Sequence, residues 1–351
     1  MLQDGFLHMR GTPLLECATN LQHTMLAKYS DEEVNAASFR GKTIAILGYG
    51  SQGRAQALNL RDAGERVIVG NRSGKSFDAA KADGFSVMSV PDAVRKADVL
   101  ALMFPDESAA AIYAADIAPY LLAGQTLSFA HGFNIHYKFI SPPADVDVIL
   151  VAPKGVGPMV RKLYVDGGGV PGLVSVEQDA SGHALETALA FAKGIGSGRT
   201  AVFASSFKDE TDTDLFGEQA VICGGVPALI EAAYQTLVDA GYPEELAFSE
   251  CAHEAKLVID LIYEGGFSRM HDFVSKTASY GGITRGNRMM NQALKAEMKT
   301  ILDEVQSGAF AREWMAEKQN GLLNYRRMVE DVRESDIEKT GREFRKTIWG
   351  K

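Results

Sequence analysis

Four carboxylates fall into two pairs with the same spacing. Asp214 and Glu218 are four residues apart, and Glu250 and Glu254 repeat this separation. On a helix, side chains at that spacing share one face. Two like charges placed this way destabilise a helix unless a cation neutralises them, and Mg²⁺ prefers carboxylate oxygens. The pairs therefore predict that a cation neutralises them, although two acidic faces in contact with water would show the same spacing.

A histidine and a lysine each follow a short apolar run. His131 comes after Thr126–Phe129, and Lys154 comes after Val148–Val151. If both runs are parallel strands, these side chains lie at the carboxyl edge of a sheet, where open α/β sheets bind ligands. His131 could then transfer a proton or orient water, and Lys154 could stabilise an oxyanion or hold Glu218 in place. A structural histidine and a surface lysine are the alternative interpretation.

A glycine-rich loop follows the apolar run Thr43–Leu47. Its sequence, Gly48-Tyr49-Gly50-Ser51-Gln52-Gly53, leads directly into a helical pattern. A strand, G-x-G-x-x-G and a helix in that order are typical of dinucleotide-binding proteins. Gly48 permits the tight turn, Gly50 lets the backbone approach a pyrophosphate, and Gly53 lets helix and strand pack closely. The βαβ pattern around the loop favours a cofactor site over a purely structural turn.

The end of the next apolar run, Val67–Val69, indicates which dinucleotide binds. An NAD site usually has an acidic residue there for the ribose 2′-hydroxyl, whereas an NADP site has a nearby Arg for the 2′-phosphate. No acid occurs in this sequence before Asp78, and the charged or hydroxyl-bearing residues present are Arg72, Ser73, Lys75 and Ser76. This composition favours NADPH, with a solvated turn carrying incidental charges as the alternative.

The elements that must position these residues follow two different patterns along the chain. Up to about Ser205, short apolar runs alternate with helical segments, which predicts an α/β fold of the Rossmann type with a doubly wound parallel sheet. Beyond it, apolar residues recur at helical spacing, which predicts an all-helical domain. We expect an N-terminal extension packed on the first domain in residues 1–40, a Rossmann domain in 41–205, and a helical metal, substrate and dimerisation domain in 206–351.

The individual elements can be assigned from the same periodicities. The predicted strands are Thr43–Leu47, Val67–Val69, Ser86–Met88, Val99–Met103, Thr126–Phe129 and Val148–Val151, with helices at Arg54–Ala63 and Phe77–Asp83 between them. The later predicted helices are Leu215–Cys223, Pro227–Ala240, Pro243–Tyr263, Ser268–Thr277, Asn287–Gln306 and Phe310–Asn320.

Composition excludes several classes of protein. The chain has 351 residues, which is enough for two domains. Its net charge is −9 and it has no basic run, and this charge distribution argues against nucleic-acid binding. Its three cysteines are too few and too scattered for a disulfide framework or a zinc site. The sequence has no apolar stretch of about 20 residues that we expect to span a bilayer. Residues 1–24 lack the order of charges typical of a secretory signal, so we expect a cytoplasmic protein.

Six blocks of the sequence resemble those of the ketol-acid reductoisomerase (acetohydroxyacid isomeroreductase) family, in the same order and at compatible spacing. They are GKTIAILGYGSQG, LMFPDESAAAIY, SFAHGFNIHY, VAPKGVG, FKDETDTDLFGEQAVICGG and SECAHEAKLVIDLIYEGG. The similarity extends over roughly residues 29–348, and the length of the helical portion resembles the short form, class I. The resemblance implies a Mg²⁺-assisted alkyl migration in 2-acetolactate or 2-aceto-2-hydroxybutyrate. Reduction by NADPH to a 2,3-dihydroxy acid follows, in branched-chain amino-acid (valine and isoleucine) biosynthesis.

The resemblance also implies roles for individual residues. Asp214 and Glu218 would bridge two Mg²⁺ ions, while Glu250 and Glu254 would reach the same centre from a partner subunit. The residues implied for other roles are His131, Lys154 and Glu218 in catalysis, Ser275 in substrate contact and Gly157 in cofactor binding. The helical domain would be of the knotted type, in a homodimer or larger homo-oligomer with a shared active site.

Several positions depart from the family pattern, near the substrate and at the 2′ end of the cofactor. The loop 72–76 is one residue shorter than the common version, and the departing residues are Arg54, Gln56, Val156, Pro158, Lys276, Ser279 and Gly282. The departures leave open a paralogue acting on a different 2-hydroxy-3-keto acid, and use of NADH. A simple β-hydroxyacid dehydrogenase and a non-catalytic nucleotide-binding paralogue are further alternatives, but neither needs the four carboxylates.

Overall fold

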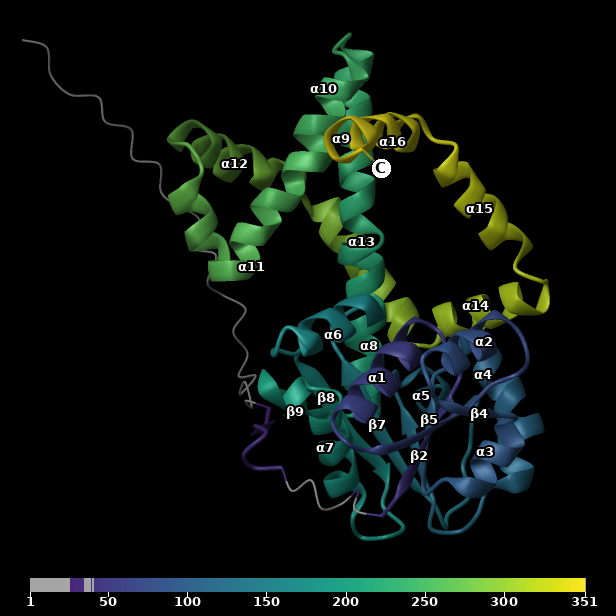
Figure 1. The fold of residues 1–351 in the computed structure, drawn as a ribbon. Helices are drawn as coiled ribbons and strands as arrows, with labels where there is room; N and C mark the ends of the chain where they lie inside the picture. Colours follow the sequence, from purple (N-terminus) through teal and green to yellow (C-terminus); the bar gives the residue numbers. More distant parts are fainter. Residues whose placement is uncertain (1–25, 35–38, 40, 351) are drawn as a thin grey trace, which may run out of the picture.

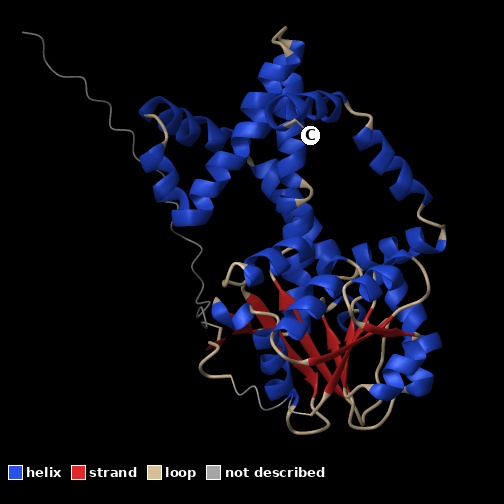
Figure 2. Ribbon diagram, in the orientation of Figure 1, coloured by secondary structure: helices blue, strands red, loops and turns tan. Residues whose placement is uncertain are grey.

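The chain folds into a sheet covered by helices, followed by a helical region that extends away from it (Figures 1 and 2). The structure, a computed structural model, describes residues 26–34, 39 and 41–350. The last strand ends at Ala204 and helix α8 (Phe207–Gly217) begins three residues later. The predicted domain boundary falls in this link, and the division into domains stays a prediction. The predicted extension, residues 1–40, lies largely outside the described residues.

One sheet of nine strands, in the order β1-β9-β8-β7-β6-β5-β2-β3-β4, is formed by the described residues. The six strands from β7 to β4 are mutually parallel, as predicted, but β8 runs antiparallel to β7 and β1 antiparallel to β9. The strands are β1 (Lys28–Tyr29), β2 (Thr43–Leu47), β3 (Arg66–Gly70), β4 (Ser86–Met88), β5 (Val99–Leu102), β6 (Thr126–Phe129), β7 (Asp147–Pro153), β8 (Gly172–Gln178) and β9 (Val202–Ala204).

Helices cover both faces of the sheet because its central strands are apolar on both sides. The helices of this part are α1 (Ser51–Asp62), α2 (Lys75–Ala82), α3 (Val90–Lys96), α4 (Asp106–Ile112), α5 (Phe133–His136), α6 (Gly157–Val165) and α7 (Ala184–Gly194). Ile44 and Ile46 pack with Leu60 of α1 and Phe191 of α7 on one face. On the other face, Phe207 belongs to the buried cluster, so burial of this ring fixes the start of α8 against the sheet.

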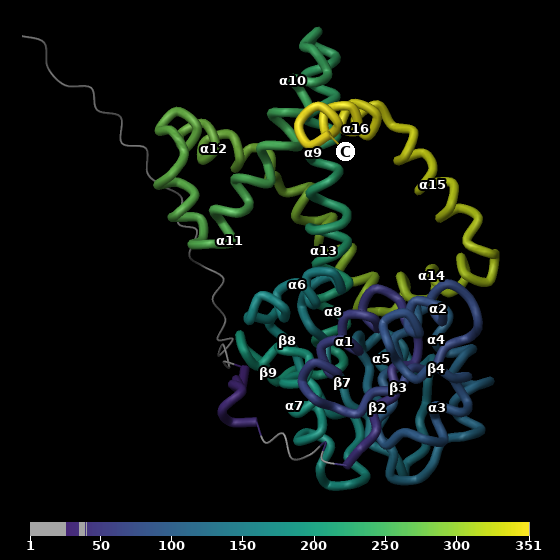
Figure 3. Tube along the Cα trace, viewed as in Figure 1, coloured from purple at the N-terminus to yellow at the C-terminus, as the bar shows by residue number. Residues whose placement is uncertain are grey.

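The helical region leaves the sheet along α9 (Gly225–Asp239), as the trace in Figure 3 shows. The remaining helices are α10 (Glu244–Phe248), α11 (Glu254–Phe273), α12 (Lys276–Met289), α13 (Gln292–Gln306), α14 (Ala309–Gln319), α15 (Leu323–Arg333) and α16 (Asp336–Trp349). Two π-helices, η5 (Glu218–Ile222) and η6 (Ser249–His253), interrupt the α-helical hydrogen bonding. Within α11, Gly265 and Gly266 have non-helical backbone angles, and φ of Gly266 is +77°.

The structure corrects several predicted elements. The predicted helix Ser268–Thr277 is interrupted: residues 268–273 are helical, but the chain becomes extended at Val274 and Ser275 and a new helix starts at Lys276. Strands β1, β8 and β9, helices α3 to α7, α15 and α16, and most of α12 were not individually predicted. The expectation that no segment could span a membrane is also wrong. By length and composition alone, the helix Phe207–Asp239 is long and apolar enough to do so.

Many large apolar side chains in the helical region are exposed in the single chain. The exposed fractions of Leu257, Tyr263 and Phe267 are 53%, 87% and 71%. Large contiguous patches of exposed apolar side chains are typical of interaction sites. Others in the same region are Leu229, Ile259, Phe273, Tyr280, Ile283, Met289 and Met290.

Candidate active site

A cavity of about 1660 Å³ lies along the carboxyl edge of the parallel strands. The glycine loop after β2, the loop after β3 and the ends of β5, β6 and β7 form its wall, and α8 closes one end. His131 and Lys154 both line it, as their positions after two strands predict. Asp214 and Glu218 reach it from α8 and the first residue of η5.

Helix α8 is held in place by capping at its N-terminus. The Ser206 hydroxyl accepts a hydrogen bond from the Asp209 N–H at 2.9 Å. Asp209 and Glu210 occupy the first turn, where negative charge stabilises the helix dipole. Capping and burial of Phe207 together fix the direction in which the acidic residues of α8 project.

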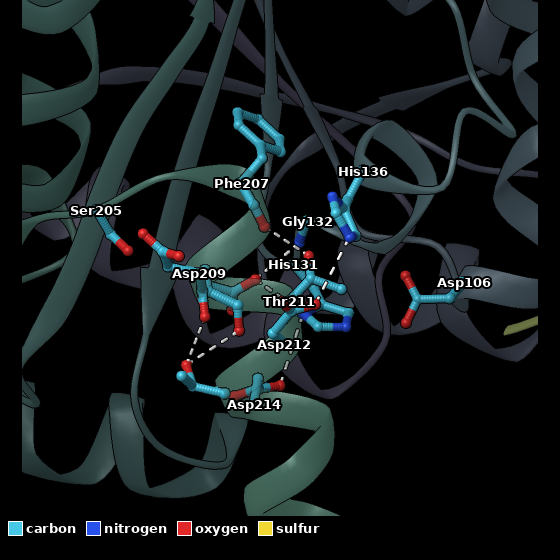
Figure 4. A network of polar contacts seen from close by, with 12 residues as sticks. Asp106, His131, Gly132, His136, Ser205, Phe207, Asp209, Thr211, Asp212 and Asp214 are labelled. Atoms are coloured by element: carbon cyan, nitrogen blue, oxygen red, sulfur yellow. Dashed lines mark hydrogen bonds and ion pairs between the residues drawn. The ribbon is translucent and has the colours of Figure 1, made fainter. Parts of the chain in front are cut away.

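Glu210 is the centre of the polar network, and its side chain has no exposed surface. Its Oε2 accepts hydrogen bonds from the Gly132 N–H at 2.9 Å and from His131 Nδ1 at 3.0 Å. Its Oε1 accepts from Lys154 Nζ at 2.8 Å, and the same ammonium donates to Asp214 Oδ1 at 2.7 Å. Figure 4 shows His131 and Gly132 against the first turns of α8, with Asp106 and Asp214 nearby. Lys154 therefore contacts Glu210 and Asp214, and not Glu218 as the sequence suggested.

Charge pairing sets the protonation of this network. Burial alone would lower the pKa of His131, but the hydrogen bond and charge of Glu210 outweigh it and raise that pKa to about 9. Burial would raise the pKa of Glu210, yet the hydrogen bond from His131 and the charge of Lys154 lower it to about 2. The buried carboxylate thus stays ionised, and His131 is held in its cationic form.

Three further polar groups of the cavity lack a partner that balances the effect of burial. His131 Nε2 is buried and has no hydrogen-bond partner among the described residues. Burial raises the pKa of Asp106, at the first residue of α4, to about 6. Partial burial, followed by the charge of Asp214, raises the pKa of Glu218. An unpaired buried nitrogen implies a missing partner, which a substrate oxygen or water would supply.

The donor set suits a hard cation. One ligand atom from each of His131, Glu210 and Asp214 lies within 4.8 Å of the others. Both oxygens of Glu210 accept hydrogen bonds, whereas Oδ2 of Asp214 has only a 3.6 Å ion pair with His131 Nδ1 and the Glu218 carboxylate has no ion pair among the described residues. Asp214 and Glu218 are therefore better placed to bind a cation than Glu210, and their oxygens are the ligands that Mg²⁺ prefers.

The glycine loop has the geometry that a dinucleotide requires. Gly48 has φ +97°, which favours glycine, and a Cβ on Gly53 would lie 2.1 Å from the carbonyl oxygen of Gly48. A Cβ on Gly50 would meet no protein atom within 4 Å, so this glycine leaves space rather than packing. The Gln52 side-chain amide donates to the Gly155 carbonyl at 2.8 Å and links the glycine loop to the loop of Lys154.

The other predicted cofactor residues divide into two groups. Arg72, Ser73, Lys75 and Ser76 line the cavity with Tyr49 and Ser51, and Arg72 and Lys75 have no ion pair in the described part of the chain. Gly157 does not line the cavity. A Cβ on Gly157 would lie 2.3 Å from the carbonyl oxygen of Ser51, so its observed role is close packing of α6 on α1.

Comparison with known families matches both parts of the chain. Residues 38–201 match the model described as acetohydroxy acid isomeroreductase, NADPH-binding domain, and residues 207–349 match ketol-acid reductoisomerase, C-terminal domain. The chain belongs to the ketol-acid reductoisomerase family. It is therefore an oxidoreductase that uses a nicotinamide cofactor.

Solved structures agree with this assignment to ketol-acid reductoisomerases. An NADH-preferring ketol-acid reductoisomerase from an uncultured archean is 43% identical, with a TM-score of 0.90 over 92% of this chain and 100% of that one. A putative oxidoreductase from Jannaschia sp. CCS1 is 15% identical, with a TM-score of 0.58 over 76% of this chain and 97% of that one. This lower similarity shows the fold alone.

Three residues that the family resemblance placed in the site do not reach the cavity within one chain. Glu250 lies in η6 and Glu254 begins α11, both exposed, and neither lines the cavity. Ser275 is the N-cap of α12, where its hydroxyl accepts from the Ala278 N–H at 3.1 Å. Figure 1 shows these helices well away from the sheet.

Sequence reasoning missed Glu210 and Asp106. Glu210 precedes Asp214 by four residues, as Asp214 precedes Glu218, so the same spacing that identified the pair extends to a third carboxylate. Asp106 starts a helix directly after β5 and lies at the same sheet edge as His131. Its position after a parallel strand was the available indication.

Proposed function

We propose that the chain is a Mg²⁺-dependent ketol-acid reductoisomerase acting on 2-acetolactate and 2-aceto-2-hydroxybutyrate. The observation that carries this proposal is the network of Glu210, His131, Lys154 and Asp214 at one end of a dinucleotide cavity. A reductase of a simple keto acid needs a proton donor near the nicotinamide. One carboxylate suffices to orient that donor, whereas in this chain Asp214 and Glu218 line the cavity in addition to Glu210.

The reaction has a definite proton and bond balance. The C2 hydroxyl of 2-acetolactate loses its proton, the methyl group moves from C2 to the C3 carbonyl carbon, and the C3 oxygen gains a proton. The resulting 2-keto acid accepts a hydride at C2 and a proton on the C2 oxygen, giving the 2,3-dihydroxy acid. When bound, the nicotinamide cofactor supplies that hydride.

The residues of the chain can perform the proton transfers. Glu218 lines the cavity from the first residue of η5, so a carboxylate oxygen there could take a proton from the substrate hydroxyl and return it. His131 Nε2 has no partner and can donate a hydrogen bond to a substrate oxygen or to water. The Lys154 ammonium places a positive charge beside the carboxylates and stabilises negative charge that develops on the substrate.

Asp214 and Glu218 would hold the metal on this chain, in a two-ion site. When bound, Mg²⁺ would polarise the two neighbouring substrate oxygens and favour ionisation of the hydroxyl. Glu210 would act behind them, since its hydrogen bonds to His131 and Lys154 fix the orientation of the groups that face the substrate. The donor types of the described residues support this assignment.

NADPH is the proposed cofactor, with NADH as an alternative. The unpaired Arg72 and Lys75 and the hydroxyls of Ser73 and Ser76 support NADPH, because a 2′-phosphate needs positive and hydrogen-bonding groups. The matching archean enzyme is described as NADH-preferring, which supports use of NADH as well.

A second copy of the chain is proposed to complete the site. Glu250, Glu254 and Ser275 lie on helices whose exposed apolar side chains need a cover, and a homodimer would bury both. The apolar run Phe207–Asp239 contains Asp214 and Glu218, which supports burial against protein rather than lipid. A cytoplasmic location agrees with this arrangement.

The test separates the two steps. Purified protein is assayed with 2-acetolactate and, separately, with the rearranged 3-hydroxy-3-methyl-2-keto acid, in Mg²⁺ or in chelator. We expect oxidation of NADPH with both substrates and loss of the 2-acetolactate reaction in chelator. Reduction of the keto acid alone, with no activity on 2-acetolactate at any Mg²⁺ concentration, would contradict the proposal.

Val156 is 67% exposed at the cavity, so a screen of bulkier 2-hydroxy-3-keto acids tests the paralogue alternative.

A further inference from the structure

A smaller cavity of about 500 Å³ adjoins the main one beyond the loop that follows β3. Asn71, Arg72 and Ser73 form one part of its wall, and Ser89 and Pro91 at the start of α3 form another. Asp116, from the π-helix η2 (Tyr113–Ile117), lines this cavity and the main cavity. Arg72 and Asp116 are the two charged residues among those that line it.

The position of this cavity identifies what binds there. In Rossmann folds the ribose 2′ group lies at the end of the second strand of the motif, which is β3 in this chain. Arg72 lies two residues after the end of that strand and has no ion pair within the described part of the chain. Asp116 likewise has no ion pair or side-chain hydrogen bond among the described residues. A cation and an anion therefore both face the 2′ end, and neither neutralises the other directly.

We propose that Asp116 is a specificity-determining residue that disfavours the 2′-phosphate of NADPH relative to the 2′-hydroxyl of NADH. The inference rests on the proposed function, since it assumes that a dinucleotide occupies the main cavity. Arg72 attracts the phosphate and Asp116 repels it, so the cofactor preference of the chain is the difference between two opposed contributions. The sequence pattern at the end of β3 shows only the first of them, because Asp116 lies more than 40 residues further along the chain.

Electrostatics gives the sign and scale of the effect. A phosphate monoester carries a charge of about −1.5 to −2 at pH 7, whereas the 2′-hydroxyl is neutral. Across a solvent-filled cavity and at about 0.1 M salt, a carboxylate changes the affinity for such an anion by roughly threefold to tenfold. The neutral hydroxyl is affected much less, so the ratio of the two affinities reports the interaction.

The test measures dissociation constants of NADPH and NADH for the full chain by titration of cofactor fluorescence. Asp116→Asn should tighten NADPH at least about threefold relative to NADH, and the effect should shrink as salt rises. Asp116→Glu keeps the charge and should leave the ratio close to wild type. The matched control is Asp78→Asn, which removes an equal charge from exposed α2 outside both cavities and should change the ratio less.

Two results would contradict different parts of the account. If both dinucleotides bind but Asp116→Asn leaves their ratio unchanged, or shifts it no more than Asp78→Asn does, the role of Asp116 is wrong and the proposed function stands. If the wild-type chain binds neither dinucleotide, the proposed function itself fails. Arg72→Ala should shift the ratio in the opposite direction from Asp116→Asn. That result would confirm that the 2′ end lies in this cavity.

Discussion

Lys154 Nζ lies 2.8 Å from Oε1 of Glu210, a carboxylate without exposed surface. A buried charge is tolerated only when it is paired and hydrogen-bonded, and Glu210 meets this condition through groups from two different strand ends and from the backbone. The ion pair therefore joins α8, which carries Asp214, to the sheet edge that carries His131 and Lys154. Activity should depend on Glu210 even though it is poorly placed to bind the metal.

The substitution Glu210→Gln should lower turnover by at least about 100-fold, because His131 and Lys154 lose the charge that orients them. It should also destabilise the fold by about 2–4 kcal/mol, because the change breaks a buried ion pair. Turnover and thermal unfolding with and without cofactor measure both effects. Asp209→Asn, an exposed acid on the same helical turn, is the control; it should leave turnover unchanged and lower stability by less than about 1 kcal/mol through the helix dipole. Activity near wild type in a folded Glu210→Gln variant would show that the network is structural.

Two glycines of the cofactor loop should separate cofactor binding from packing. Gly50→Ala adds a methyl group where no protein atom lies within 4 Å, so the melting temperature should stay close to wild type while dinucleotide affinity falls about tenfold or more. Gly53→Ala forces a methyl group against the carbonyl oxygen of Gly48 and should lower the melting temperature clearly. Unchanged dinucleotide affinity in Gly50→Ala would place the pyrophosphate elsewhere.

A shared active site predicts that two inactive variants can complement each other. Asp214→Asn and Glu250→Gln should each abolish Mg²⁺-dependent turnover and leave dinucleotide binding intact. In a mixed dimer purified through two different tags, one of the two sites receives both substitutions and the other receives none. The mixed dimer should therefore recover about half of the wild-type activity. Mixed dimers without activity would mean that Asp214 and Glu250 act in the same chain.

Asp106 gives a pH-dependent prediction for stability. Its pKa is raised from 3.8 to about 6 in the folded chain, so the folded state disfavours the charged form. The resulting penalty is absent below the unfolded pKa and complete above pH 6. Asp106→Asn should therefore increase the free energy of unfolding by about 1–2 kcal/mol at pH 7.5 and by little at pH 4. The value at pH 7.5 is reduced from the full effect of the pKa shift because the side chain is partly accessible to solvent. Denaturant unfolding in chelator at both pH values measures this difference, and equal stability of variant and wild type at pH 7.5 would contradict it.

The parallel part of the fold was predictable because its strands are short, apolar runs separated by turns and helices. All six predicted strands are present, from Thr43–Leu47 to Asp147–Pro153. Strand β8 was missed because its mixed pattern of buried and half-exposed residues follows no simple period. The helix break at Ser275 was missed because it depends on capping by a serine, which sequence periodicity does not detect.

The candidate site was predictable only where a strand end or helical spacing fixes a side chain. His131, Lys154, Asp214 and Glu218 were identified in this way and lie around one cavity. Glu210 was missed because a buried carboxylate becomes functional only through its partners, which are remote in sequence. Glu250 and Ser275 do not line the cavity of the single chain, and in the proposed dimer their place in a site would depend on a second chain, whose position no property of one sequence determines.

The most direct test of the central claim is the rate of NADPH oxidation by the purified chain with 2-acetolactate, measured in Mg²⁺ and in chelator. The account predicts steady turnover in Mg²⁺, its loss in chelator, and its return when Mg²⁺ is added back in excess. Turnover that is the same in chelator, or no oxidation of NADPH or NADH in Mg²⁺ by a protein that binds the cofactor, would contradict it.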